Sequence, residues 1–153
     1  MTTGKHLLAA AGLWLLSLCG NAAAPVVEPI WLTILGDPLD PLSETVQVDV
    51  TSAVVFDTSR LVSIRANRSQ DRMARDGQAF RSYVSSVMID CETGVARHRS
   101  QMLYAGPLWT GSMRSVVYDE KDVRMLAFRD MAANPKDRIV KAACSINTVK
   151  KSK

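Results

Sequence analysis

The segment SYVSSVMIDCETGVARHRSQMLY, residues 82–104, determines the fold class of this chain. Apolar and polar residues alternate along both of its arms, which is the side-chain period of β-strands. Between the arms, Glu92-Thr93-Gly94 places a glycine where a tight turn favours positive φ. Apolar residues fall on both phases of the first arm. The segment therefore predicts a β-hairpin whose first arm is a central strand of an antiparallel sheet.

The N-terminus has the three parts of a secretory signal peptide. Lys5 lies in a short stretch without acidic residues, an apolar run follows over residues 7–19, and GNAAA supplies small residues after it. The apolar run is shorter than the ~20 residues of a membrane-spanning helix. We therefore expect a signal peptide at residues 1–24 and one exported domain at residues 25–153.

Cys19 closes the apolar run, and a cysteine at this place is where exported lipoproteins receive their lipid. Such signals call for a small residue just before the cysteine, whereas Leu18 stands there. We therefore expect no lipid anchor, and attachment to a membrane only if Cys19 is lipidated. The expected location is the periplasm or the cell surface.

The two remaining cysteines, Cys91 and Cys144, are expected to form a disulfide. Thiols pair in the oxidising compartments outside the cytoplasm. A metal site would need three or four cysteine, histidine or carboxylate ligands at close spacing, and His98 is the single histidine after the signal peptide. A cysteine–histidine nucleophile is formally possible but leaves the second cysteine unexplained. No metal and no cofactor are expected.

The net charge excludes one class of partner. The chain has 19 Lys and Arg against 15 Asp and Glu, and loss of Lys5 with the signal peptide leaves 18 basic residues. This excess is mild, whereas a nucleic-acid-binding domain would carry a dominant basic face. We therefore expect a protein partner and no nucleic acid.

Short strands flank the hairpin on its N-terminal side. They are expected at residues 29–35, 45–50, 53–57 and 60–66. Residues 36–44 contain one glycine and two prolines and should form a loop. The polar segment at residues 67–78 is expected to be an exposed connection into the hairpin.

The return arm of the hairpin carries the only candidate base. Simple alternation turns Arg97 and Arg99 outward and turns His98 the other way, with Met102 and Tyr104. A partly buried structural histidine is therefore expected at this position, because no nucleophile and orienting acid stand at a recognisable spacing.

The C-terminal part begins with a Gly/Pro loop at residues 105–112 that carries Trp109, and strand candidates follow at 113–118 and 123–131. A helix should begin near Asn134, which is a good N-cap. Its apolar stripe contains Ile139, Val140, Ala143 and Cys144. Strands followed by one packed helix predict an α+β domain, mainly an antiparallel β-sheet with a C-terminal helix and one disulfide.

Several markers in this order resemble a known family. Trp31, the strand VQVDVTSAV, the strand YVSSVMIDC with its arginine-bearing return, and a closing NPKDRIVKAAC are similar to the surface-adhesin protein E family of small exported bacterial proteins. The resemblance covers about residues 30–145. It implies an antiparallel sheet backed by a C-terminal helix, a Cys91–Cys144 bridge and no enzymatic activity. Family members named for their function attach bacteria to host matrix proteins.

Three classes of function remain. The first is a non-enzymatic binding module of the bacterial envelope, with an adhesin's host matrix proteins among its partners. Its candidate binding residues are Arg68, Arg72, Arg75, Arg97, Arg99 and Trp109. The second is an enzyme that uses His98 with Ser85, Ser86 or Asp90, for which no nucleophile elbow, metal signature or phosphate loop is present. The third is a structural or partner-binding periplasmic protein that pairs through a sheet edge.

Overall fold

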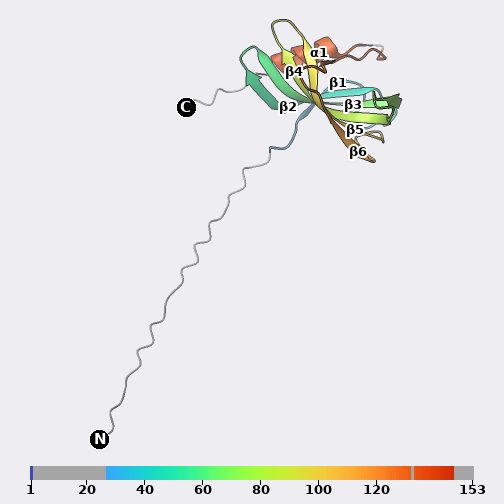
Figure 1. The fold of residues 1–153 in the computed structure, drawn as a ribbon. Helices are drawn as coiled ribbons and strands as arrows, with labels where there is room; N and C mark the ends of the chain where they lie inside the picture. Colours follow the sequence, from blue (N-terminus) through green and yellow to red (C-terminus); the bar gives the residue numbers. More distant parts are fainter. Residues whose placement is uncertain (2–26, 132, 147–153) are drawn as a thin grey trace.

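A computed structural model describes residue 1, residues 27–131 and residues 133–146 of the chain. Apart from Met1, the expected signal peptide, with Cys19, lies outside the described residues. The described residues form one twisted sheet with a helix packed against it (Figure 1).

Six strands form an antiparallel meander in which each strand pairs with the next along the chain. They are β1 (Trp31–Leu35), β2 (Thr45–Phe56), β3 (Ser59–Met73), β4 (Ala79–Asp90), β5 (Ala96–Tyr104) and β6 (Met113–Val117). A short β7 (Arg124–Met125) pairs with β5 beyond the end of β6, and α1 (Lys136–Cys144) follows. The predicted α+β class with a mainly antiparallel sheet is confirmed.

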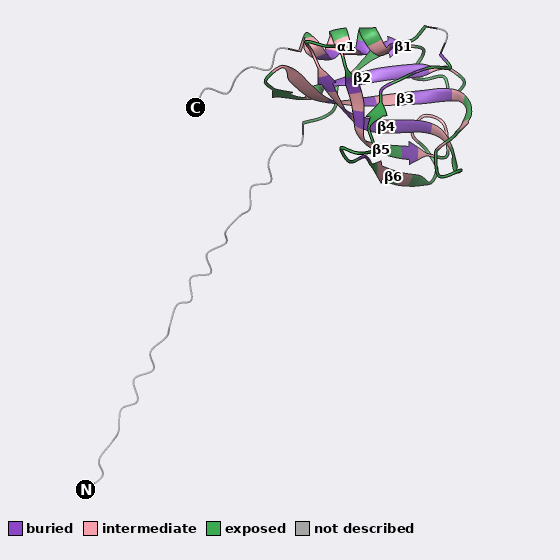
Figure 2. Ribbon diagram, turned by 45° about the horizontal axis from the view of Figure 1, so that its top comes forward, coloured by how far each residue is buried: buried purple, intermediate pink, exposed green. Residues whose placement is uncertain are grey.

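The core lies on one face of this sheet, where apolar side chains of the strands meet α1. Fully buried core residues include Val46, Val48, Val62, Ile64, Val87, Ile89, Ile139 and Ala143. Residues 126–131 cross the same face, because Leu126 and Phe128 are 2% exposed within this core. We call the face covered by α1 and residues 126–131 the inner face, and the opposite one the outer face. Figure 2 shows the buried residues following the central strands beneath α1.

The helix and the disulfide agree with the sequence prediction. Asn134 Oδ1 accepts a hydrogen bond from the Lys136 amide, although Pro135 occupies the N-cap and the helix begins one residue later than expected. Ile139 and Ala143 are fully buried. The bond between Cys91 and Cys144 joins the residue after β4 to the last residue of α1. The helix is therefore linked covalently to the centre of the sheet.

The expectation of an exposed connection at residues 67–78 holds for most of residues 70–78 but is wrong for Asn67 and Arg68, which are buried, and for the extent of the strand. Strand β3 continues to Met73, and only residues 74–78 form the turn into β4. Asn67 is fully buried because its side-chain amide donates to Pro41 O and Ser43 O and accepts from the Leu108 amide. The buried polar side chain of Asn67 has its hydrogen-bond partners in loops that are distant in sequence. The polarity of the local sequence does not reveal such partners.

The strands also differ from the expectation in two local features. Residues 45–56 form one strand with an irregularity between Asp49 and Val54, not two strands. In β5, Val87 pairs with His98 and Ser86 pairs with Ser100, so Arg99 is an extra, bulged residue. The bulge reverses the alternation after His98. For this reason the expected placement of Met102 and Tyr104 beside His98 is wrong.

Candidate binding cavity

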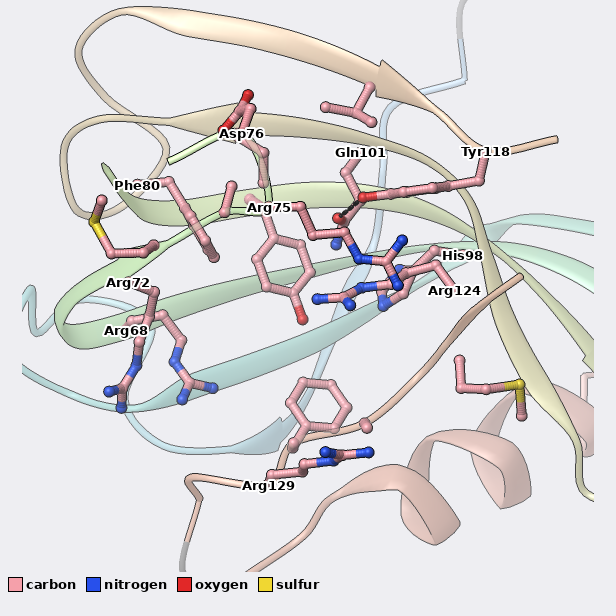
Figure 3. A pocket seen from close by; sticks show the side chains of 18 of the residues that line it. Arg68, Arg72, Arg75, Asp76, Phe80, His98, Gln101, Tyr118, Arg124 and Arg129 are labelled. Carbon is pink, nitrogen blue, oxygen red and sulfur yellow. Dashed lines mark hydrogen bonds between the residues drawn. The ribbon is translucent and has the colours of Figure 1, made fainter. Parts of the chain in front are cut away.

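A cavity of about 810 Å³ opens on the inner face beside α1, between the sheet and the segment that follows β6. Its lining comes from β3 and the turn after it, from β4, β5 and β6, and from residues 122–130 (Figure 3). The bulge at Arg99 helps to form it, because Gln101 and Leu103 now face the cavity together with His98. This volume falls in the range of small-molecule and peptide-anchor sites.

Arginine side chains dominate the rim of this cavity. Six of them line it: Arg68, Arg72, Arg75, Arg114, Arg124 and Arg129. Three aspartates, Asp76, Asp122 and Asp130, are the carboxylates of the lining. The rim therefore carries an excess of positive charge, and walls of low dielectric concentrate the field of such a group of charges.

Four of the six arginines have carboxylate partners. Arg75 pairs with Asp122 at 2.6 Å and Arg114 pairs with Asp76 at 2.8 Å. Arg68 and Arg72 share Glu44, at 3.2 Å and 3.7 Å. The contacts of Arg75 and Arg114 are charge-assisted hydrogen bonds, whereas those of Arg68 and Arg72 with Glu44 are ion pairs without hydrogen-bond geometry.

Arg68 is the most deeply placed of the group, with a side chain only 7% exposed. Besides Glu44 it reaches Asp130 of the covering segment at 3.8 Å. A buried guanidinium without a counterion is costly, so Glu44, the residue just before β2, is needed to keep Arg68 at this depth. The pair connects β3 to the loop before β2 and to the segment that covers the cavity.

Arg124 and Arg129 differ from the other four. Neither forms an ion pair or a side-chain hydrogen bond with any residue that the structure describes, and both are exposed. Figure 3 shows Arg124 close to His98, consistent with the pairing of β7 with β5. These two guanidinium groups are therefore available to an anion that approaches the cavity.

The floor of the cavity is aromatic. Four rings follow one another along it, with centroids 6.2 Å apart from Phe80 to Tyr83, 6.1 Å from Tyr83 to His98 and 6.5 Å from His98 to Tyr118. The Tyr118 hydroxyl donates to Gln101 Oε1 at 2.6 Å. In contrast, the Tyr83 hydroxyl has no hydrogen-bond partner among the described residues, although Tyr83 is only 7% exposed. Burial raises the pKa of Tyr83, so this hydroxyl keeps its proton.

His98 has a defined tautomer because of Ser85. Ser85 Oγ lies 2.7 Å from Ser100 O and 2.6 Å from His98 Nδ1. A carbonyl oxygen only accepts, so the single hydroxyl proton goes to Ser100 O, and Nδ1 must donate to Ser85 Oγ. Neutral His98 is thus assigned a proton on Nδ1 and a free lone pair on Nε2, which has no partner in the described part of the chain.

Burial, together with a smaller contribution from the charge of Arg124, lowers the pKa of His98 to about 4. The unfolded chain binds this proton near pH 6.5, so the stability contributed by neutral His98 is complete above pH 6.5 and is lost as the pH falls to about 4. We expect urea unfolding to show this loss, with a slope approaching about 1.4 kcal/mol per pH unit. His98→Gln should flatten the profile in that window, and an identical profile in the variant would contradict the neutral, buried histidine.

The enzyme hypothesis paired His98 with Ser85, Ser86 or Asp90, and the structure brings only Ser85 to the histidine. In that pair the imidazole donates to a hydroxyl that is 2% exposed, which is the reverse of a base that accepts a serine proton. Hydrogen bonds from the Thr93 and Glu92 amides lower the pKa of Asp90, which caps the hairpin turn. The geometry therefore supports a structural role for these residues.

Trp109 lies away from the cavity, on the outer face. The Arg65 guanidinium stacks between two indoles, 4.2 Å from the Trp31 ring centroid and 3.9 Å from that of Trp109. Arg65 Nε also donates to Gln47 Oε1 at 2.7 Å. Trp109 Nε1 donates to Tyr83 O, which fixes its own loop to the sheet. These contacts are those of a residue that anchors its own loop.

The structure thus divides the candidate residues into separate groups. Arg68, Arg72 and Arg75 lie together on the cavity rim. Arg97 and Arg99 lie half-buried on β5, do not line the cavity, and form no side-chain hydrogen bond or ion pair with the described residues.

Sequence reasoning missed three rim residues, Arg114, Arg124 and Arg129. Their positions depend on β6 and β7 joining β5 one after the other, which brings residues 113–130 over the inner face. One signal was present: VRMLAFRD has two arginines among apolar residues, as expected of a segment that covers a core and keeps its charges at an opening.

Two absences complete the description of the site. Within the described ranges, no group of three or more histidine, cysteine or carboxylate side chains is arranged to hold a metal ion. The described part of the chain also contains no helix of the length and apolarity needed to cross a membrane.

The fold and the cavity define a small disulfide-bonded α+β domain with a positively charged hollow beside α1. A family model described as surface-adhesin protein E matches residues 31–145. The chain therefore belongs to the surface-adhesin protein E family, which implies an exported or cell-surface protein and suggests a role as a surface adhesin with a protein partner. No curated protein and no solved structure matches the chain.

Proposed function

We propose that this protein is an exported, non-enzymatic binding module of the bacterial envelope whose arginine-lined cavity receives acidic groups of a protein partner. The observation that carries the proposal is the convergence of six arginines on one hollow whose lining includes three aspartates. Host extracellular matrix proteins are the first partners to test, because the family is one of surface adhesins.

The cavity suits such a role better than an isolated basic loop would. Ion pairs orient four of the arginines around the hollow, which reduces the side-chain freedom that a partner must remove on binding. Arg124 and Arg129 stand beside this set without carboxylate partners among the described residues. Complementary charge would speed the encounter and select acidic partners.

Reversing the charge of these two residues tests the proposal. Arg124→Glu/Arg129→Glu should weaken binding to an immobilised matrix protein by at least tenfold, because two attractive contacts become repulsive. Raising the salt concentration should weaken binding of the unaltered protein in the same direction. Biolayer interferometry would measure the dissociation constants, and circular dichroism would show that the fold is retained.

Arg97→Glu/Arg99→Glu is the matched control, since it makes the same change in net charge on a part of β5 that does not line the cavity. We expect this variant to bind within about threefold of the unaltered protein. If it loses binding while the cavity variant keeps it, the binding surface is on β5 and the cavity proposal is wrong.

A structural role through sheet pairing is the second candidate. β6 ends the sheet order, and on this strand Val117 is 79% exposed and Met113 is 50% exposed. An exposed edge strand with apolar side chains can pair with a strand of another chain. Such pairing would leave the arginine cavity unused.

A further inference from the structure

We propose that the cavity recognises an amphipathic anion, a group in which a carboxylate is attached to an apolar ring or chain, and not negative charge alone. The inference deepens the proposed function, because it concerns the same cavity and states which chemical group enters it. It combines three features of the site: the aromatic floor, the unpaired polar atoms on that floor and the positive rim.

The floor can hold an apolar body. Phe80, Tyr83, His98 and Tyr118 form a row of rings with successive centroids 6.1 to 6.5 Å apart, and Phe128, 2% exposed, also lines the cavity. Aromatic rings bind other rings favourably in edge-to-face and offset arrangements at such separations. A ligand consisting of charge alone would leave this apolar surface in contact with water.

Two polar atoms on the floor point to a bound group. Tyr83 is 7% exposed and His98 is 5% exposed. Neither the Tyr83 hydroxyl nor His98 Nε2 has a hydrogen-bond partner among the described residues, and neither is one of the fully buried unpaired atoms, so both face the open cavity and can be reached by a ligand. The hydroxyl can donate to an anion, and Nε2 can accept from a ligand donor. A group that reaches the floor would satisfy them.

The rim supplies the site for the charge. Arg124 lies beside His98, since β7 pairs with β5 at this point, and it has no carboxylate partner in the described residues. An apolar body on the aromatic row would therefore place its carboxylate next to a free guanidinium. A guanidinium–carboxylate pair that is partly screened from water is among the stronger polar contacts in proteins.

Isotope-labelled protein titrated with three probes tests this inference by NMR. The probes are 2-naphthoate, its uncharged isostere 2-naphthamide, and acetate, which has the charge without the apolar body. We expect 2-naphthoate to bind at least tenfold more tightly than either of the others. Its largest shift changes should fall on the ring signals of Tyr83 and His98.

Two variants show whether the binding is in the cavity. Ala127→Trp fills the cavity from an exposed lining position without removing a core residue, and should weaken 2-naphthoate by at least tenfold. Arg124→Gln should remove the preference for 2-naphthoate over 2-naphthamide. Equal affinity for the two naphthalene probes in the unaltered protein, or binding that survives Ala127→Trp, would overturn the inference.

Competition distinguishes two sources of such a group. If 2-naphthoate blocks capture of the matrix protein, the partner inserts the group; if it binds without affecting capture, a free small molecule supplies it. Both results support an amphipathic ligand. If no naphthoate binds but capture still depends on Arg124 and Arg129, this inference fails and the proposed function stands. If naphthoate binds and no acidic partner does, the proposed function fails instead.

Discussion

Replacing Cys144 by serine should lower the free energy of unfolding by about 2–5 kcal/mol, the usual range for native disulfides of small exported domains. The bond to Cys91 spans 53 residues of sequence, and closing a loop of that length removes about 4 kcal/mol of unfolded-state entropy in the chain-entropy model. It also ties α1, which has only nine residues, to the central strand β4. Urea unfolding would measure the loss.

A double variant, Cys91→Ser/Cys144→Ser, is the control, because it excludes effects of the thiol left behind in the single variant. Both should unfold at lower urea concentrations than the unaltered protein. Thiol titration of the denatured, unreduced exported protein should find no free thiol at these two positions. An unchanged unfolding midpoint in both variants would contradict a disulfide that stabilises the fold.

Asn67→Leu should cost about 2–4 kcal/mol, although the sequence places this residue in a polar stretch. The fully buried amide bonds Pro41 O at 3.1 Å, Ser43 O at 2.8 Å and the Leu108 amide at 2.8 Å. Leucine has a similar volume but removes the amide's hydrogen bonds to both carbonyl oxygens and leaves the half-buried Leu108 amide without its acceptor. Leu108 also has a positive φ of 49°, a conformation that needs support in a residue other than glycine.

Gln70→Leu on the same strand is the matched control, because Gln70 is exposed and makes no side-chain hydrogen bond with the described residues. Its cost should stay within about 0.5 kcal/mol. Comparable losses in the two variants would show that the hydrogen bonds of Asn67 to residues 41–43 and to Leu108 contribute little to the free energy of unfolding. Proteolysis should also cut the loop at residues 105–112 faster in the Asn67 variant, because that loop loses one of its fixing contacts.

Local sequence patterns were enough to predict the β4–β5 hairpin and the C-terminal helix. Alternation identified the hairpin of β4 and β5, and the cap at Asn134 with its apolar stripe identified α1. The expected export of the chain predicted the Cys91–Cys144 disulfide, because cysteines usually pair in oxidising compartments outside the cytoplasm. Each of these features depends on neighbours in sequence or on a general chemical condition.

The second half of β3 could not be predicted in this way. Residues 67–72 are polar, and polarity normally indicates exposure, but the partners of residues 67–69 come from residues 41–44 and from the loop after β5. A buried polar residue is recognisable only once its partner is known. The same holds for Arg68, which sequence reasoning placed in a solvated basic loop.

The cavity was not predicted from the sequence, because its geometry depends on one extra residue. The bulge at Arg99 turns Gln101 and Leu103 to the same side as His98, and simple alternation has no means of showing a bulge. The return of the chain along β5 as β7 then brings Arg124 to His98. Sequence reasoning singled out three arginines at residues 68–75, but their convergence with three others required the fold.

The most direct test of the binding cavity is NMR of isotope-labelled protein with and without its acidic partner. His98 reports on the cavity, while the indole N–H groups of Trp31 and Trp109 report on the outer face, where they flank Arg65. We expect the His98 ring signals to shift on addition of the partner and the two indole signals to stay in place. Shifts of the indole signals with an unchanged His98 would place the binding surface on the outer face and contradict the proposed function.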